Sequence, residues 1–193
     1  RMGEWSDMAS QWWGKLCKLI ALLHAASKQH FSGVHMISEN SVASEEIVIN
    51  APAEIVWDVL LDFANYELWN PFCPKMKGEP VVGSPLEMQV DLGSGLQQQV
   101  EYVTRLEPYH TIVWSMENKP DDPVHADRMQ RITPVSASSC RYWSIDEFSG
   151  EFVPAMMEAM GEQIERGFNN CAKGLKQRAE HLSGRVLPGA ALR

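Results

Sequence analysis

The strongest constraint in this sequence is an apolar stripe along its C-terminal part. Large apolar side chains recur there every three or four residues, at Phe152, Met156, Met160, Ile164, Phe168, Cys171, Leu175, Ala179 and Leu182. This spacing predicts a helix with one apolar face. At about 1.5 Å per residue, a helix of roughly thirty residues crosses a whole domain. A helix of that length with one apolar face needs a curved sheet to lie in.

Five segments before this helix have the alternation and the boundaries of β-strands. They are residues 86–92, 97–107, 111–117, 125–133 and 139–149, and Gly93-Ser94-Gly95 and Glu107-Pro108-Tyr109-His110 mark turns between them. Turns at regular intervals favour an antiparallel meander over parallel βαβ units. Further upstream, Ile47 and Ile49 alternate in a first strand, and Pro52 begins a helix over residues 52–63. We expect a second short helix over residues 65–70.

The chain resembles the SRPBCC superfamily, also called START-like or birch-pollen-allergen-like, and most of all its polyketide cyclase/dehydrase branch. The resemblance lies in Ala51-Pro52-Ala53-Glu54-Ile55-Val56-Trp57-Asp58, Trp69-Asn70-Pro71, Gly78, Glu147-Phe148-Ser149-Gly150 and the closing helix. It implies an α+β helix-grip fold, in which a curved antiparallel sheet of about seven strands surrounds a long C-terminal helix. It also implies a cavity for an apolar molecule, but it supplies no catalytic signature at the level of residues.

The sequence divides into an N-terminal helical extension (1–35), a linker (36–44), the SRPBCC-like ligand-binding domain (45–183) and a tail (184–193). A stripe at helical spacing in the extension joins Trp5, Met8, Trp12, Leu16, Leu19, Leu23 and Ala26. So large an apolar face is seldom left in water. We expect it to pack on protein. The surface could belong to its own domain, where the helix could form a lid over the cavity mouth, or to a second copy in a homodimer. A membrane is disfavoured because the polar side of this helix is not rich in Lys and Arg.

Composition excludes several classes of partner and cofactor. The formal net charge is −8 and no basic run occurs, so no nucleic-acid partner is expected, because phosphates need a cationic face. No stretch is long and apolar enough to span a membrane. The four cysteines are widely separated, which favours free thiols in a reducing, cytoplasmic compartment. No metal-ligand spacing, nucleophile elbow or phosphate loop is found, so we expect no metal and no cofactor.

Strand alternation predicts which polar residues face the interior. If Ile132 faces inward, then Arg128 and Gln130 on the same strand do so as well, and an inward Tyr142 brings Ser144 and Asp146 with it. An Arg and an Asp on adjacent strands form either an internal ion pair or the polar floor of an apolar pocket. An error of one residue in the register would instead place both in solvent.

Other residues are expected to line the same cavity. They are Trp69, Asn70, Phe72, Tyr102 (on a face shared with Leu106), Trp114, Met116, Met156, Met157, Met160 and Ile164. Methionine adapts to irregular shapes, so a methionine-lined wall suits a variable ligand, although each Met equally suits core packing. Trp69 is either a cavity residue or a hydrophobic plug, and Asn70 either binds the ligand or caps a turn.

These residues support three hypotheses. In the first, the protein binds a small apolar molecule, expected to be aromatic or polycyclic, and catalyses a cofactor-free cyclase, dehydratase or lyase step. Asp146 would then be the acid or base and Arg128 would stabilise an oxyanion or enolate, while Gln130, Tyr102 and Ser144 would orient the substrate. In the second, it is a non-catalytic carrier of a lipid, quinone or hydrophobic metabolite. In the third, it is an interaction module that dimerises through the Trp-rich helix.

Light scattering and ligand uptake by a chain that starts at Met36 test the role of the extension. We expect removal of residues 1–35 to change the particle size or the affinity for ligand, because packing on a second copy or over the cavity mouth would be lost. The full-length chain is the control. Unchanged size, solubility and ligand uptake would show that the extension is incidental.

Overall fold

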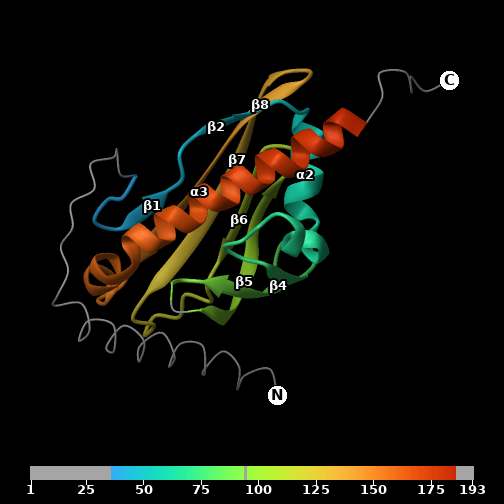
Figure 1. Ribbon diagram of the computed structural model, residues 1–193. Helices are drawn as coiled ribbons and strands as arrows, with labels where there is room; N and C mark the ends of the chain where they lie inside the picture. The colour runs from blue at the N-terminus through green and yellow to red at the C-terminus, as the bar shows by residue number, and fades with distance from the viewer. Residues whose placement is uncertain (1–35, 94, 186–193) are drawn as a thin grey trace.

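A long helix lies across an antiparallel sheet in the computed structural model, which describes residues 36–93 and 95–185 (Figure 1). In chain order the elements are β1 (Ser41–Ala43), β2 (Ile47–Ile49), α2 (Ala53–Leu61), the 3-10 helix η1 (Phe63–Leu68), β3 (Lys75–Gly78), β4 (Pro85–Asp91), β5 (Leu96–Glu107), β6 (Thr111–Ser115), β7 (His125–Ser136), β8 (Ser139–Ser149) and α3 (Val153–Arg185). The sheet order is β1-β8-β7-β6-β5-β4-β3, and β2 also pairs with β8. The predicted helix-grip fold is therefore confirmed. The predicted N-terminal helix lies outside the described residues.

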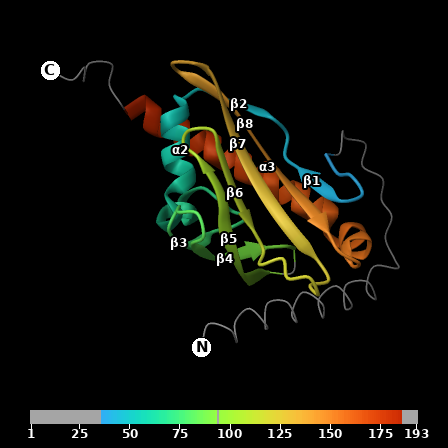
Figure 2. The ribbon, with the colours of Figure 1, turned by 180° about the vertical axis from the view of Figure 1, so that it is seen from behind.

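The apolar stripe of α3 is the centre of the core. Met156, Phe168, Leu175 and Ala179 are fully buried, as the helical periodicity predicts. Seen from behind, the strands lie in front of α3 and cross it obliquely (Figure 2). Among the described residues the helix therefore covers one face of the sheet, and an interior ligand would lie on that covered face.

The edge of the sheet differs from the prediction. Residues 36–44 were expected to form a linker, but Ser41–Ala43 pair with β8 as strand β1, with Val42 opposite Asp146. Val42 is fully buried, which explains why the segment joins the core. A strand of three residues with one large apolar side chain has no readable period, so alternation could not reveal it.

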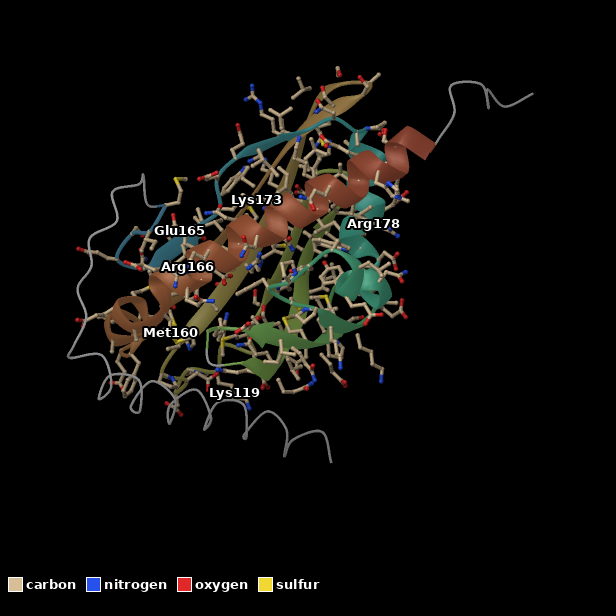
Figure 3. The ribbon with its side chains drawn as sticks, viewed as in Figure 1. Lys119, Met160, Glu165, Arg166, Lys173 and Arg178 are labelled. Atoms are coloured by element: carbon tan, nitrogen blue, oxygen red, sulfur yellow. The ribbon has the colours of Figure 1, made fainter. Side chains whose placement is uncertain are left out.

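Polar side chains of α3 bind the backbone on either side of this edge strand. The backbone N–H of Met36 donates to Oε1 of Glu165 at 2.9 Å, and that of Glu45 donates to Oδ1 of Asn169 at 2.8 Å. Figure 3 shows Glu165 on the side of α3 that faces β1. Further along, the N–H of Asn50 donates to Glu180 at 2.8 Å. Edge backbone groups that would otherwise be open to pairing with another chain are thus satisfied from within.

A β-bulge in β5 sets which of its residues face the helix. Val103 pairs with Trp114 and Arg105 pairs with Val113, so Thr104 is an extra residue without its own partner in β6. A bulge of this kind reverses the side-chain alternation on either side of it. N-terminal to it, Glu101 lies opposite the fully buried Leu86. The prediction that Tyr102 shares the inward face with Leu106 is therefore wrong, and Glu101 takes the inward position.

The segment before β3 lies directly against α3 at two glycines. A Cβ on Gly167 would overlap the ring of Phe72, and a Cβ on Gly174 would overlap the backbone oxygen of Trp69. The two glycines are seven residues apart and so share one face of the helix. The absence of side chains there lets the segment 69–73 approach the helix axis closely and brings Phe72 into the interior.

Alanine at these glycines should destabilise the protein although alanine favours helix. We expect Gly167→Ala to lower the free energy of unfolding by roughly 1–3 kcal/mol through overpacking. Gly174→Ala should cost at least as much, because the overlapping atom belongs to the backbone. Urea denaturation followed by circular dichroism measures both.

Gly184→Ala is the matched control, since nothing lies within 4 Å of a Cβ at that position of α3. It should be neutral or stabilising by up to about 1 kcal/mol, the difference in helix propensity. Equal effects at all three glycines would contradict the close approach of the segment 69–73.

Candidate interior binding site

Two small cavities lie on the inner face of the sheet, the first beside the segment 66–73 and the second beside α3. The first, of about 40 Å³, is lined by Tyr66, Asn70, Phe72, Cys73, Met76, Met88, Val90, Gln99, Glu101, Trp114, Arg128, Gln130 and Asp146. The second, of about 30 Å³, is lined by Leu92, Gln99, Glu101, Met116, Val124, Ala126, Asp146, Phe148 and Ile164. Gln99, Glu101 and Asp146 belong to both linings. These three residues, which we call the polar partition, therefore stand between two mainly apolar spaces.

The space is smaller than the sequence led us to expect. A single water needs about 10–15 Å³ measured in this way, so each cavity admits only a few groups of that size. Sites for drug-sized ligands occupy roughly 300–1,000 Å³. Aromatic side chains fill much of the interior, including the edge-to-face pair of Phe72 and Phe168 with ring centroids 5.4 Å apart. A polycyclic ligand does not fit this conformation.

Arg128 is the central cation of the site. It lies opposite Asp146 on β8 and Trp114 on β6 and is 6% exposed. Its guanidinium carbon lies 3.6 Å from the ring centroid of Phe168 and 5.6 Å from that of Phe72. Such cation–π contacts partly replace lost hydration. Its Nη2 also donates a long hydrogen bond, 3.5 Å, to Oγ of Ser144.

The internal ion pair that the sequence left open is not formed. Among residues 36–93 and 95–185, the ion pairs with N–O distances within 4.0 Å do not include one from Arg128 to Asp146 or to Glu101. Oδ1 of Asp146 is enclosed and accepts no hydrogen bond from the described residues. The prediction that Arg128 and Asp146 both face the interior is nevertheless correct, so the three charged groups share a cavity without being joined.

Burial shifts the protonation of both carboxyls. The pKa of Glu101 rises to about 8, chiefly because of desolvation and secondly because of the charge on Asp146, while Arg128 opposes the rise. Desolvation also raises the pKa of Asp146 to about 6, again against the effect of Arg128. Because the two groups interact, they lose their protons in two steps that belong to the pair. Burial thus favours the protonated form of the pair, and the upward shift is larger for Glu101.

Gln130 and Tyr142 form a polar contact beside the cation. The hydroxyl of Tyr142 donates to Oε1 of Gln130 at 2.6 Å. Nε2 of Gln130 is enclosed and has no hydrogen-bond partner in the described part of the chain. Gln130 lines the first cavity, whereas Tyr142 and Ser144 line neither. The structure thus places Tyr142 and Ser144 behind Gln130 and Arg128, where they hold the lining side chains.

The segment before β3 contributes Asn70 and Phe72 to the first cavity. Oδ1 of Asn70 accepts from the backbone N–H of Phe72 at 3.2 Å and of Cys73 at 3.0 Å, so Asn70 caps a turn as well as lining the space. Trp69 lines neither cavity. Its ring packs edge-on against Tyr66 with centroids 4.7 Å apart, which is the plug that the sequence offered as the alternative.

The predicted methionine wall on α3 is wrong in its location. Met156 and Met160 are buried in the core and Met157 packs beside it, and none of the three lines a cavity. Ile164 is the residue of α3 that reaches the second cavity. Trp114 and Met116 line the first and second cavities as expected. The methionines of the first cavity are instead Met76 and Met88, from β3 and β4.

Sequence reasoning missed Glu101 and Gln99, two members of the polar partition. The signal was present, because Val103 and Leu106 are three residues apart and cannot face the same way along a regular strand. Their odd spacing indicates an extra residue between them, which the structure shows as the bulge. If alternation is applied separately to the residues before and after Thr104, Glu101 is predicted to face inward.

The described residues contain no cluster of three His, Cys, Asp or Glu side chains able to hold a metal ion. Within the same residues, no helix has the length and apolarity needed to cross a bilayer. Cys73, Cys140 and Cys171 are buried free thiols. The charged side chains that line the two cavities are Arg128, Glu101 and Asp146.

A curved antiparallel sheet closed by a long C-terminal helix over an interior site defines the helix-grip, START-like class of proteins. The chain belongs to the family described as polyketide cyclase / dehydrase and lipid transport, whose model matches residues 42–180. No curated protein matches the chain by sequence.

Solved structures similar to this chain share its fold. An aromatase/cyclase, ZhuI, from Streptomyces sp. R1128 is 20% identical, with a TM-score of 0.59 over 73% of this chain and 93% of that one. A START superfamily protein from Mycobacterium smegmatis is 19% identical, with a TM-score of 0.56 over 74% and 99%. Norcoclaurine synthase from Thalictrum flavum is 18% identical, with a TM-score of 0.56 over 80% and 100%. At these identities the likeness shows the fold alone.

Glu101→Gln should alter how stability depends on pH. The folded-state pKa of about 8 exceeds the value of about 4.3 for a solvated Glu. The wild-type free energy of unfolding therefore falls as pH rises between these two values, since the unfolded state releases the proton more readily. From about pH 5 to about pH 8.5, the wild type should lose at least about 1.4 kcal/mol more than the variant, the equivalent of one pKa unit. Urea denaturation at both pH values measures this difference.

Glu87→Gln is the control for that experiment, because Glu87 is exposed on neighbouring β4. It should keep the pH dependence of the wild type. If Glu101→Gln also keeps it, Glu101 is not held in its protonated form by the fold.

Proposed function

We propose that this protein binds a small, mainly apolar molecule in the cavities on the inner face of the sheet, and that Glu101, Asp146 and Arg128 carry out acid–base chemistry on it without a cofactor. The observation that carries the proposal is a buried guanidinium that shares a cavity with two carboxyls but pairs with neither. Buried charges in proteins are normally paired or hydrogen-bonded, because leaving them bare costs free energy. Groups held ready in this way are typical of a functional site.

The two carboxyls suit opposite roles. Glu101 has the higher pKa and so suits the role of proton donor, whereas Asp146, with the lower pKa, suits that of acceptor. A pair of titrating groups whose pKa values are separated by their surroundings is a common arrangement for acid and base. Arg128 supplies fixed N–H donors where an enolate or alkoxide oxygen would develop charge. Cyclisation, dehydration and related lyase steps need these three functions.

The family to which the chain belongs supports the reaction class, since its description joins cyclases and dehydrases with lipid transport. The aromatase/cyclase neighbour has the same fold. The small cavities favour a compact substrate, or one that displaces lining side chains such as Met76 and Met88. A carrier without chemistry remains the second candidate, because the same family description includes transport.

Comparison of the compounds bound to wild type and to Asp146→Asn separates these functions. Each protein is purified from its own host and its bound molecules are identified by native mass spectrometry. An enzyme should show one compound in the wild type and its unconverted precursor in the variant, because binding persists while proton transfer is lost. Turnover of that precursor should fall by roughly 100-fold or more in the variant.

Glu147→Gln provides the matched control, because it removes one negative charge from the exposed neighbour of Asp146 on β8. It should carry the same compound as the wild type. The same compound in wild type and Asp146→Asn would identify a carrier. Absence of any bound molecule from all three proteins, with no uptake from host extract, would overturn the proposal of ligand binding.

A further inference from the structure

The two cavities are separated by polar side chains and walled elsewhere mainly by apolar ones. Gln99, Glu101 and Asp146 contact both spaces. Leu92, Val124 and Phe148 line the second cavity. Val90, Met88 and Met76 line the first, together with the polar Asn70, Arg128 and Gln130. A molecule that enters both spaces therefore meets hydrogen-bonding groups at its middle, with apolar side chains available beyond them in each cavity.

The charges at the partition restrict the group that can sit there. Arg128 contributes one positive charge beside the two carboxyls, and one of these carboxyls is ionised when the pair holds a single proton. The local charge is then close to zero. A carboxylate or phosphate on the ligand would face Asp146 without a second cation among the lining residues. A ketone or hydroxyl can accept from Arg128 or from protonated Glu101 at no such cost.

Resting on the proposed function, we infer that the ligand is an uncharged molecule whose carbonyl or hydroxyl lies between two apolar arms, one arm in each cavity. Fatty acids and other molecules with a charged group at one end are excluded by this arrangement. An apolar arm in the second cavity would pack against Ala126, which is buried on the inward face of β7. The length of each arm is limited to a few carbons unless side chains move.

Isomeric alcohols test the position of the polar group directly. 3-Pentanol has two carbons on each side of its hydroxyl, whereas 1-pentanol has the same composition with the hydroxyl at one end. Saturation-transfer NMR and chemical-shift titration on the full-length chain give the Kd of each. We expect 3-pentanol to bind about tenfold more tightly, because 1-pentanol cannot fill both spaces and keep its hydroxyl at the partition. 3-Pentanone should bind like 3-pentanol, and butanoate should not bind.

Ala126→Val tests the second arm, because the added methyl groups occupy the second cavity. It should weaken 3-pentanol about tenfold and leave 1-pentanol unchanged. Ala137→Val, at an exposed position in the turn between β7 and β8, is the matched control and should change neither. Because the isomer comparison uses the wild-type chain, it decides the inference even if Ala126→Val fails to fold.

The outcomes separate the inference from the proposed function. Equal affinity for the two alcohols, tight binding of butanoate, or a folded Ala126→Val variant with unchanged affinity for 3-pentanol would overturn the two-armed ligand while leaving interior binding in place. If no probe binds the wild type and its purified form carries no molecule, the inference and the proposed function fail together.

Discussion

A guanidinium held inside the protein without an ion-pair partner is the constraint on which the interior depends. Removing such a charge from water is costly, and the nearby aromatic faces recover only part of that cost. The two rings come from different elements, since Phe168 belongs to α3 and Phe72 to the segment before β3. Three features must therefore be compatible, because each positions a group around the same cation. They are the orientation of α3 about its own axis, the packing of that segment against Gly167 and the inward direction of Arg128 on β7.

The carboxyls near this cation make the charge of the interior sensitive to pH and to a bound molecule. A salt bridge between Arg128 and a carboxylate would hold both groups in their charged forms. Here the carboxyls of Glu101 and Asp146 are not in such a pair, and each affects the proton affinity of the other. Any molecule that changes the polarity of that space must also change where the proton resides. Ligand binding and proton affinity are thus thermodynamically linked in this fold, whether the result is a reaction or only selective retention.

The fold was predictable from the sequence wherever a period was long and regular. The stripe from Phe152 to Leu182 predicted α3, and the alternation around Ile132 and Tyr142 placed Arg128, Gln130 and Asp146 on the correct face because β7 and β8 pair without a break at these positions. The same rule failed in β5, where one extra residue reverses the pattern. It also failed for β1, which is too short to show any period.

The volume and walls of the site were beyond the reach of sequence patterns. Whether a buried methionine lines a space or fills it depends on the packing of several elements at once, and residues with identical periodicity have different roles here. Ile164 reaches a cavity while Met160, four residues earlier on the same face, does not. Alternation identifies the inward face of an element, but only the assembled layers determine which inward side chains leave a gap between them.

The bulge at Thr104 has a consequence for how this architecture can diversify. A regular β5 of the present length cannot direct both Leu106 and Glu101 inward, because the two residues are five positions apart and successive side chains point to opposite faces. Loss of Thr104 itself would leave a regular strand that keeps both side chains inward, whereas pairing of the full-length strand without the bulge would turn Glu101 outward and bring Tyr102 and Val100 to the interior. The chemical character of the chamber can therefore change by a one-residue shift in strand register without any substitution, a route that comparison of aligned positions would overlook.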